Sequence, residues 1–548
     1  MSSDPKHKTT SLDELYDYLK RFSLSDSLFV ISIVNNAFKY GINALSDDAN
    51  KNTVAWITDH CKTDIEKFAL MAHMTRMARF LLLSRANDYK NPILDTGTQD
   101  MGYAIHLVAT LYEVEVEGTP KSLEDLTINF GRLGQWQFPL QARRDAIIGR
   151  GYLLFEEIPK AQGIRYNFDA KMKEYFDLDV LQFIASGLAA WTMSTGVLKY
   201  KLNIEVPELA KIVSTATLDK FVELSSGTPE DYRRYIRGEN WKSSDKLLDI
   251  YFLDPLLKMP AVRVERSRKL EPGQYVVPQP LYLLMRASLG VFHLLADKER
   301  EIATGQGKSG KNDFKEVFGE VYREYVGRQL SQATQPVCFI DLDKEIITDI
   351  RKPDFALIKD DICILFEVKT SFLTLEPRML FDKALAKQEI DLPKGNFKKA
   401  VDQLNTFEEG IKTGKIGDTR FIGITKIVKI IVGFEDLFLA NAFLLPITKD
   451  TYREQMNRFQ IATLSDIELL GAKLANGGDV LKVVWEKAIS PELSQWSLSA
   501  FVFQNTKETS AENPLLKKAF SDFFLRITGT NYNLDDDYLM ESGKKHHS

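Results

Sequence analysis

Apolar residues in the first 300 positions recur mainly three and four residues apart, which is the spacing of helices that bury one face. This pattern predicts a large, mainly α-helical N-terminal region over residues 1–300. The clearest predicted helices are Trp56–Arg85, Met101–Tyr112, Val180–Leu198 and Pro280–Leu295. Val180–Leu198 is uncharged, but its Gln, Ser and Thr residues make it too polar for a membrane span, so we expect a buried helix and no membrane association.

The pattern changes at residues 301–312, which are rich in glycine and polar residues and predict a linker. Gly305 and the pair Gly310-Lys311 have the spacing of a phosphate-binding loop. Asn312, however, stands where that loop needs Ser or Thr, and no predicted strand precedes it. We therefore favour a linker over a nucleotide site.

Residues 313–440 mix helical spacing with short apolar runs and predict an α/β core with a mixed central sheet. The expected order is helix, three strands, helix and strand, over Phe314–Leu330, Pro336–Asp341, Asp354–Lys359, Ile362–Thr370, Asn396–Phe407 and Ile427–Phe434. Residues 441–530 predict a mainly helical C-terminal extension, with candidate strand pieces at Leu481–Trp485 and Ser497–Phe503. Residues 531–548 predict a flexible tail.

Two of these strands flank Asp360-Asp361 and predict a β-hairpin. A two-residue turn sets Lys359 opposite Ile362, and counting back along both strands then sets Asp354 opposite Glu367. A four-residue turn keeps this pairing and a three-residue turn breaks it. The predicted register therefore depends on the length of the turn.

Asp354, Glu367 and Lys369 are expected to converge at the open end of this hairpin, because side chains two residues apart share one face of a strand. Facing carboxylates destabilise a sheet unless a cation offsets them, and Mg²⁺ prefers oxygen ligands of this kind. Lys369 can then hold or deprotonate a water molecule, or steady charge on a phosphate. This combination is typical of metal-dependent phosphodiester hydrolysis, with Mn²⁺ as an expected substitute for Mg²⁺. The alternative is a charged hairpin held by surface ion pairs.

These residues resemble the PD-(D/E)xK nuclease superfamily, whose fold is restriction-endonuclease-like. The match consists of Pro353-Asp354, twelve intervening residues and Glu367-Val368-Lys369, set in the predicted order of elements. It covers roughly residues 313–434, less than a quarter of the chain. The resemblance implies a Mg²⁺-dependent nuclease with Asp354 and Glu367 as metal ligands and Lys369 as a catalytic residue.

The resemblance also implies further site residues. An acidic residue on the preceding helix often completes the metal site in this superfamily, and Glu324 is favoured over Glu320 because it lies closer to the apolar stripe of that helix. Some relatives carry a glutamine on the following helix, where this chain has Gln403, although Phe407 stands where one sub-pattern has tyrosine. The basic residues expected to contact nucleic-acid phosphates are Arg351, Lys352, Lys398 and Lys399.

Composition limits the other chemistries. The 548 residues carry a formal net charge of −5, so any nucleic acid must be bound by local basic patches. No histidine lies in the nuclease-like segment, and the three cysteines lack metal-ligand spacing, which disfavours zinc and histidine–metal sites. The odd cysteine count and the polar N-terminus favour a cytoplasmic protein.

We therefore expect a metal-dependent nuclease, with a DNA endonuclease as the favoured form. A nuclease core joined to a large helical region resembles bacterial restriction or anti-phage effectors, in which the helical region would recognise substrate, a partner protein or a second copy. Two alternatives stay open. One is a non-catalytic nucleic-acid-binding or scaffold protein that retains the nuclease fold, and the other is a repair exonuclease.

Overall fold

The computed structural model describes residues 11–40, 51–85, 89–115, 123–137, 140, 142–194, 197–198, 207–238, 241–252, 254–271, 273–307, 313–393, 395–506 and 512–530. The chain divides into two units, and each unit combines segments that are far apart in sequence. The first contains residues 1–125, 169–293 and 521–548, and the second contains residues 126–168 and 294–520.

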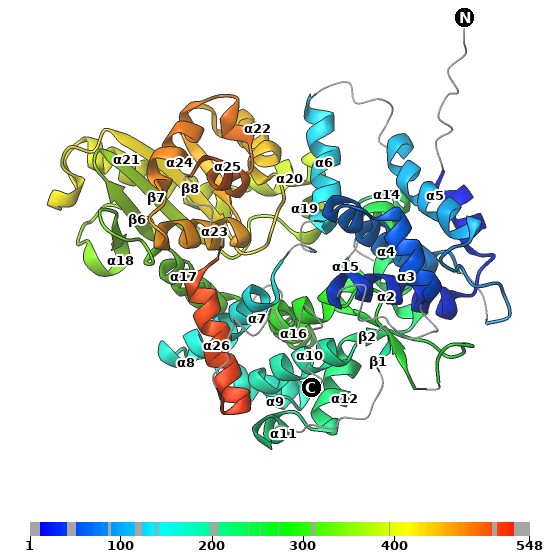
Figure 1. Ribbon diagram of the computed structural model, residues 1–548. Coiled ribbons are helices and arrows are strands. Elements are labelled where there is room, and N and C mark those ends of the chain that lie inside the picture. Colours follow the sequence, from blue (N-terminus) through cyan, green and yellow to red (C-terminus); the bar gives the residue numbers. More distant parts are fainter. Residues whose placement is uncertain are drawn as a thin grey trace, which may run out of the picture. The chain divides into compact units, whose positions relative to one another are not determined.

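The first unit is mainly helical, as its apolar spacing predicted (Figure 1). Its helices are α1 (Leu12–Leu19), α2 (Leu24–Tyr40), α3 (Lys51–His60), α4 (Asp64–Leu83), α5 (Gln99–Glu115), α9 (Phe168–Phe176), α10 (Val180–Met193), α11 (Pro207–Ile212), α12 (Thr215–Leu224), α13 (Pro229–Ile236), α14 (Asp245–Tyr251) and α15 (Asp254–Lys258). A small sheet in the order β1-β4-β3-β2 joins Val197–Leu198, Tyr275–Val276, Ala261–Arg263 and Ser226–Gly227.

Local capping explains one departure from the expected helices. The predicted helix Trp56–Arg85 is two helices, α3 and α4, because Thr63 caps the second. The Thr63 hydroxyl accepts from the Glu66 N–H at 3.2 Å, and the Glu66 carboxylate accepts from the Thr63 N–H at 2.8 Å. The uncharged stretch from Val180 forms the largely buried helix α10, and none of the helices described is long and apolar enough to cross a membrane.

The second unit contains the predicted α/β core. Its elements are α7 (Arg144–Tyr152), the π-helical turn η4 (Leu153–Glu157), α8 (Ile158–Ala161), α17 (Asp313–Leu330), β5 (Cys338–Asp341), α18 (Leu342–Glu345), β6 (Phe355–Lys359), β7 (Ile362–Lys369), α19 (Leu375–Leu380), α20 (Lys383–Ile390), α21 (Asn396–Lys412), η5 (Thr419–Phe421), β8 (Lys426–Gly433), α22 (Ala440–Tyr452), η6 (Arg453–Met456), β9 (Phe459–Ala462), α23 (Leu464–Ala475), α24 (Val480–Ile489), η7 (Leu493–Gln495) and α25 (Leu498–Asn505). Four helices include residues of both units: α6 (Leu123–Gln137), α9, α16 (Leu281–Gly305) and α26 (Pro514–Thr528).

A mixed five-stranded sheet in the order β5-β6-β7-β8-β9 forms the centre of the second unit. The first three strands are antiparallel neighbours, and β7, β8 and β9 are parallel neighbours. Strand β7 is buried along nearly its whole length, which explains its almost unbroken apolar sequence. From α17 to β8 the predicted helix, three strands, helix and strand occur in order, and the short helices α18, α19, α20 and η5 are added between them.

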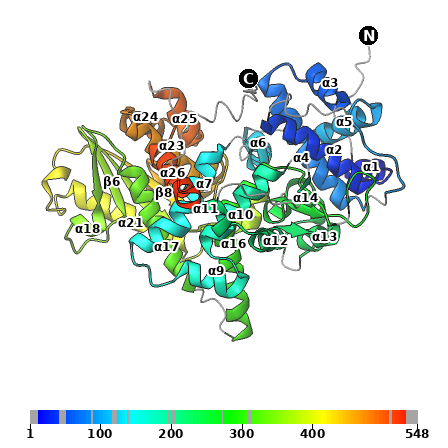
Figure 2. The same cartoon turned by 60° about the horizontal axis from the view of Figure 1, so that its bottom comes forward.

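Helices cover both faces of this sheet. Cys363 and Leu365 of β7 pack in one core cluster with Val401 and Leu404 of α21. Helix α17 contacts the sheet at β7 and lies beside it in both views (Figure 1 and Figure 2). The apolar residues that predicted α17 are buried along it, among them Phe314, Val317, Phe318 and Val321. Helices α17 and α21 thus bring side chains to the hairpin of β6 and β7 from two different parts of the chain.

Several expectations are corrected by the structure. Leu481–Trp485 and Ser497–Phe503 lie in helices α24 and α25, while the strand at Phe459–Ala462 was missed. Residues 301–305 belong to helix α16 rather than to a linker, and 308–312 and the predicted tail at 531–548 lie outside the described residues. The two units also differ from the predicted domain boundaries: residues 126–168 and 441–520 belong to the unit that holds the core.

Candidate functional site

The β6–β7 hairpin has the register that the two-residue turn predicted. Lys359 pairs with Ile362, and Phe355 pairs with Phe366. Asp360 in the turn has φ +54°, a left-handed conformation that aspartate tolerates better than most residues. This pairing is confirmed along the whole ladder, and it carries the next residue on each strand, Asp354 and Glu367, toward the open end.

Asp354 lies where the regular ladder ends, and its side chain closes that end. Its N–H donates to the Phe366 carbonyl at 3.0 Å, and its carboxylate Oδ2 accepts from the Val368 N–H at 2.7 Å. The carboxylate is 15% exposed. A residue before β6 is thus fixed by its side chain to the strand that carries Glu367 and Lys369.

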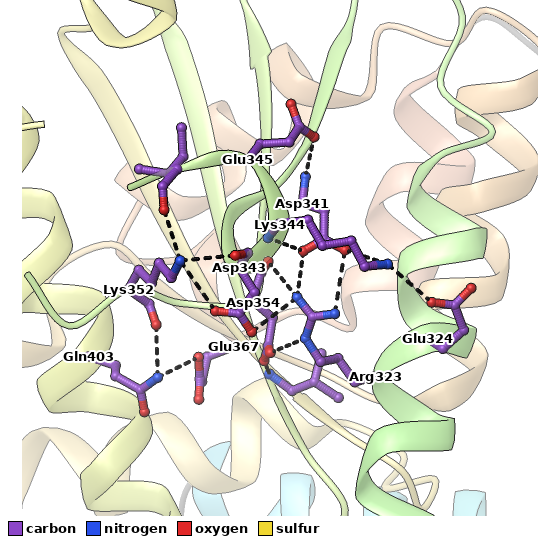
Figure 3. A network of polar contacts seen from close by, with 12 residues as sticks. Arg323, Glu324, Asp341, Asp343, Lys344, Glu345, Lys352, Asp354, Glu367 and Gln403 are labelled. Atoms are coloured by element: carbon purple, nitrogen blue, oxygen red, sulfur yellow. Dashed lines mark hydrogen bonds and ion pairs between the residues drawn. The ribbon is translucent and has the colours of Figure 1, made fainter. Parts of the chain in front are cut away.

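Glu367 is 2% exposed and contacts two of the residues that the sequence singled out. Its Oε1 accepts a hydrogen bond from the Lys369 ammonium, and its Oε2 lies 3.3 Å from Gln403 Nε2. The same Gln403 amide donates to the Lys352 carbonyl at 2.9 Å, so it links α21 to the segment before β6 (Figure 3). Gln403 therefore contacts Glu367 from α21, the helix before β8.

Burial makes the acidic pair electrostatically costly. The pKa of Glu367 is raised to about 7: burial raises it most, the negative charge of Asp354 also raises it, and Lys369 lowers it. Burial also raises the pKa of Asp354, although the Val368 N–H and Arg323 act in the opposite direction. Neither set of partners offsets the loss of water around these two carboxyl groups.

An arginine that the sequence analysis missed binds Asp354. Arg323 of α17 donates from Nε to Asp354 Oδ1 at 2.7 Å and from Nη2 to Asp341 Oδ1 at 2.6 Å. Its Nη2 also lies 3.3 Å from Asp343 Oδ2, so three carboxylates surround one guanidinium (Figure 3). The sequence offered one sign of Asp341. This residue ends the predicted strand Pro336–Asp341, and in the structure that strand pairs with β6, which begins directly after Asp354.

Neither Glu324 nor Glu320 joins the acidic pair. Glu324 forms ion pairs with Arg328 at 3.1 Å and Lys344 at 3.7 Å, and it points away from Asp354 (Figure 3). Glu320 is exposed. Because neighbouring positions on a helix point about 100° apart, α17 presents Arg323 where an acid was expected. Among the residues that the structure describes, no three His, Cys, Asp or Glu side chains form a group that could hold a metal ion.

The four predicted phosphate contacts fall into two kinds. Lys352 donates from Nζ to the carbonyls of Asp343 at 3.1 Å and Ile346 at 2.9 Å, so it stabilises its own loop. Lys398 forms an ion pair with Asp402 on the same helix at 3.1 Å. Arg351 and Lys399 are exposed. Of the four, the exposed two are the better candidates for contact with a nucleic-acid backbone.

The donor set fits a small divalent cation. Among the residues that the structure describes, one hydrogen-bond donor reaches each oxygen of Asp354, which leaves a lone pair on each for another ligand. Glu367 adds a second buried carboxylate, whose pKa is raised first by burial and then by the negative charge of Asp354. Mg²⁺ is commonly held by one or two carboxylates with water completing its shell, so two acidic side chains are enough.

No protein-family model, curated protein or solved structure matches this chain. The candidate site must therefore be judged by its own geometry. That geometry unites two buried carboxyl groups, an ammonium group and a glutamine amide at one end of a hairpin, and it adds an arginine that the sequence did not indicate.

Proposed function

We propose that this protein is a Mg²⁺-dependent nuclease that hydrolyses phosphodiester bonds, with DNA as its substrate. The observation that carries the proposal is the buried pair Asp354 and Glu367, with the Lys369 ammonium hydrogen-bonded to Glu367. Two buried acids beside an amine suit phosphodiester hydrolysis, because the acids can hold a cation and the amine can hold a water molecule or accept its proton.

Each residue of the site then has a defined task. Asp354 and Glu367 would hold the cation, whose positive charge stabilises the negative charge that builds up on the phosphate. Lys369 would hold the attacking water or accept its proton, since it lies on the same strand as Glu367 and against it. Gln403 fixes the orientation of Glu367 through the hydrogen bond to Oε2. Arg351 and Lys399 would bind the backbone on either side of the cleaved bond.

Plasmid cleavage tests the proposal directly. Supercoiled DNA is incubated with wild type, Asp354→Ala or Asp361→Ala in Mg²⁺, in Mn²⁺ or in a chelator. Asp361 is the matched control because it belongs to the same hairpin but lies at the exposed turn. We expect wild type and Asp361→Ala to nick the plasmid with either metal and Asp354→Ala to fail. Equal cutting by all three proteins would contradict the proposal.

One observation favours a second function, a non-catalytic nucleic-acid-binding protein or scaffold. Arg323 and the Val368 N–H already bind both oxygens of Asp354, and a purely structural ion pair would look the same. The two functions differ in an electrophoretic mobility assay without metal, combined with the plasmid assay. A scaffold shifts DNA and never nicks it in any metal.

The mode of cutting and the biological role also belong to the proposal. We favour an endonuclease over a repair exonuclease, and end-labelled linear DNA compared with closed circles separates the two. The role that we propose is bacterial restriction or anti-phage defence, with the helical first unit as the part that recognises a trigger, a partner or a second copy. Phage plating on cells that express wild type or Asp354→Ala tests this role, because defence must disappear with the carboxylate.

A further inference from the structure

Arg323 has more contacts than a simple counter-ion of Asp354 needs. Its Nε donates to Asp354 Oδ1 at 2.7 Å, and its Nη2 donates to Asp341 Oδ1 at 2.6 Å. The Nη2 atom also lies 3.3 Å from Asp343 Oδ2 and 3.3 Å from the Asp354 carbonyl oxygen. Asp341 and Asp343 therefore hold one end of the guanidinium while the other end holds Asp354.

An aromatic ring fixes the plane of this guanidinium. Arg323 Cζ lies 4.5 Å from the centre of the Phe355 ring, the residue directly after Asp354. Gly327, one helical turn after Arg323, lets that ring approach α17, because a Cβ there would lie only 2.9 Å from Phe355 Cζ. The arginine is thus held by two anchoring carboxylates and a ring, and it is rigid before any ligand arrives.

The consequence for Asp354 is a fixed carboxylate plane. Arg323 binds one oxygen and the Val368 N–H binds the other, from two different elements. A carboxylate held in this way cannot rotate, yet it keeps one lone pair on each oxygen. Outer hydrogen-bond partners that orient a metal ligand typically contribute 10- to 100-fold to metal affinity, so such a contact has a measurable effect.

We propose that Arg323 is a positioning residue of the candidate site, which orients Asp354 for a divalent cation and is itself held by Asp341 and Asp343. The inference rests on the proposed function, because it assumes that Asp354 is a metal ligand. Simple Coulomb repulsion makes the opposite prediction: removing a positive charge next to the site would tighten the binding of a cation. Weaker cation binding after removal of Arg323 therefore supports the positioning role, and tighter binding supports simple repulsion.

The test is Mn²⁺ affinity, measured from the electron paramagnetic resonance signal of the free ion with the full chain. We expect Arg323→Gln to weaken binding by roughly 10- to 100-fold and Arg323→Lys to recover only part of the loss, because an ammonium cannot reproduce the fork of the guanidinium. Arg328→Gln is the matched control on the same helix. Arg328 pairs with Glu157 and Glu324 rather than with Asp354, so its removal should leave Mn²⁺ affinity unchanged.

Arg323→Lys keeps the test decisive if Arg323→Gln does not fold. This variant retains the positive charge, so Coulomb repulsion predicts unchanged Mn²⁺ binding, whereas the positioning role predicts weaker binding. Unchanged or tighter binding in Arg323→Gln, or unchanged binding in Arg323→Lys, with binding still dependent on Asp354, would overturn the positioning role and leave the nuclease proposal intact. Equal Mn²⁺ binding by wild type and Asp354→Asn would instead overturn both.

Discussion

Acidic residues with basic partners lie at both ends of the β6–β7 hairpin, but their pKa values are shifted in opposite directions. At the turn, Asp361 accepts from the Thr425 hydroxyl at 2.6 Å and pairs with Lys426 at 3.2 Å, and the Thr425 hydrogen bond lowers its pKa. At the open end, Asp354 and Glu367 also have hydrogen-bonded and cationic partners, yet their pKa values are raised.

Burial accounts for the difference. The turn-end acid stays in water, so its partners act on a fully hydrated group, whereas the open-end acids lose their water and their partners do not replace it. Acidic and basic residues at a strand end are ordinary when they are solvated. Where acidic residues are buried and their partners do not replace the lost water, a cation gains the most, which sets the open end apart as the candidate site.

The largest expected effect compares the two lysines of the hairpin. Lys369→Ala removes the amine beside Glu367 and should lower the rate of plasmid nicking by about 10²- to 10⁴-fold, the usual contribution of a group that transfers a proton. Lys359, at the turn end, pairs with Asp479 at 2.9 Å on the surface, so Lys359→Ala should keep the wild-type rate. Single-turnover cleavage in saturating Mg²⁺ measures both, and similar losses in the two variants would remove the distinction between the ends.

The second prediction concerns the stability of the metal-free protein as the pH changes. The folded-state pKa of Glu367, about 7, lies above its ordinary value of 4.5, so the folded state binds the extra proton and stability falls as the pH rises toward 7. A shift of this size corresponds to about 3 kcal/mol, and Glu367→Gln should abolish that part of the loss, which falls between about pH 4.5 and about pH 7.

Urea denaturation in a chelator provides the measurement. The Asp361 pKa is lowered instead, so its contribution is present at neutral pH and is lost as the pH falls through its depressed value. The same titration of Asp361→Asn is therefore the control, and its curve should depart from wild type only in acid. Parallel pH profiles for wild type and Glu367→Gln would show that burial does not raise the pKa of Glu367.

The sequence predicted the hairpin and its open-end residues because that geometry is local. Turn length fixes the register, and alternation then places Glu367 and Lys369 on one face, without knowledge of the rest of the chain. Gln403 came from the resemblance to the nuclease superfamily and not from local geometry. The order of elements from α17 to β8 was also readable, since each has a clear apolar period.

Arg323 could not be predicted in the same way. Which residue of α17 meets Asp354 depends on the rotation of that helix against the sheet, and the apolar stripe fixes this only to within about one residue, or 100°. Rotation by that amount exchanges Glu324 for Arg323. Helices α24 and α25 were misjudged for a related reason: short buried apolar runs such as Leu481–Trp485 fit a strand or a buried helix equally well.

A smaller effect, on protein stability, is expected to differ between alanine substitutions at two glycines of α17. Gly327→Ala would place a Cβ 2.9 Å from the Phe355 ring, so the ring beneath Arg323 must move, and we expect a loss of about 1–3 kcal/mol in stability with weaker Mn²⁺ binding. Gly319 is the control, since a Cβ there would meet only Thr370, at 3.9 Å. Gly319→Ala should be neutral or stabilising by up to about 1 kcal/mol. Thermal unfolding ranks the two, and equal melting temperatures would show that the Phe355 contact does not constrain this helix.

The smallest predicted effect concerns substrate affinity at the two ends of the hairpin. Lys399 is exposed on α21, the helix whose Gln403 reaches the open end, whereas Lys426 lies at the turn, paired with Asp361. In an Asp354→Asn background that binds without cutting, Lys399→Ala should weaken DNA binding a few fold and reduce the salt slope by about one, because one phosphate contact is lost. Lys426→Ala should leave the slope unchanged. If both lysines reduced it equally, DNA would lie along the whole hairpin, and burial alone would no longer distinguish the end that we propose as the site of cleavage.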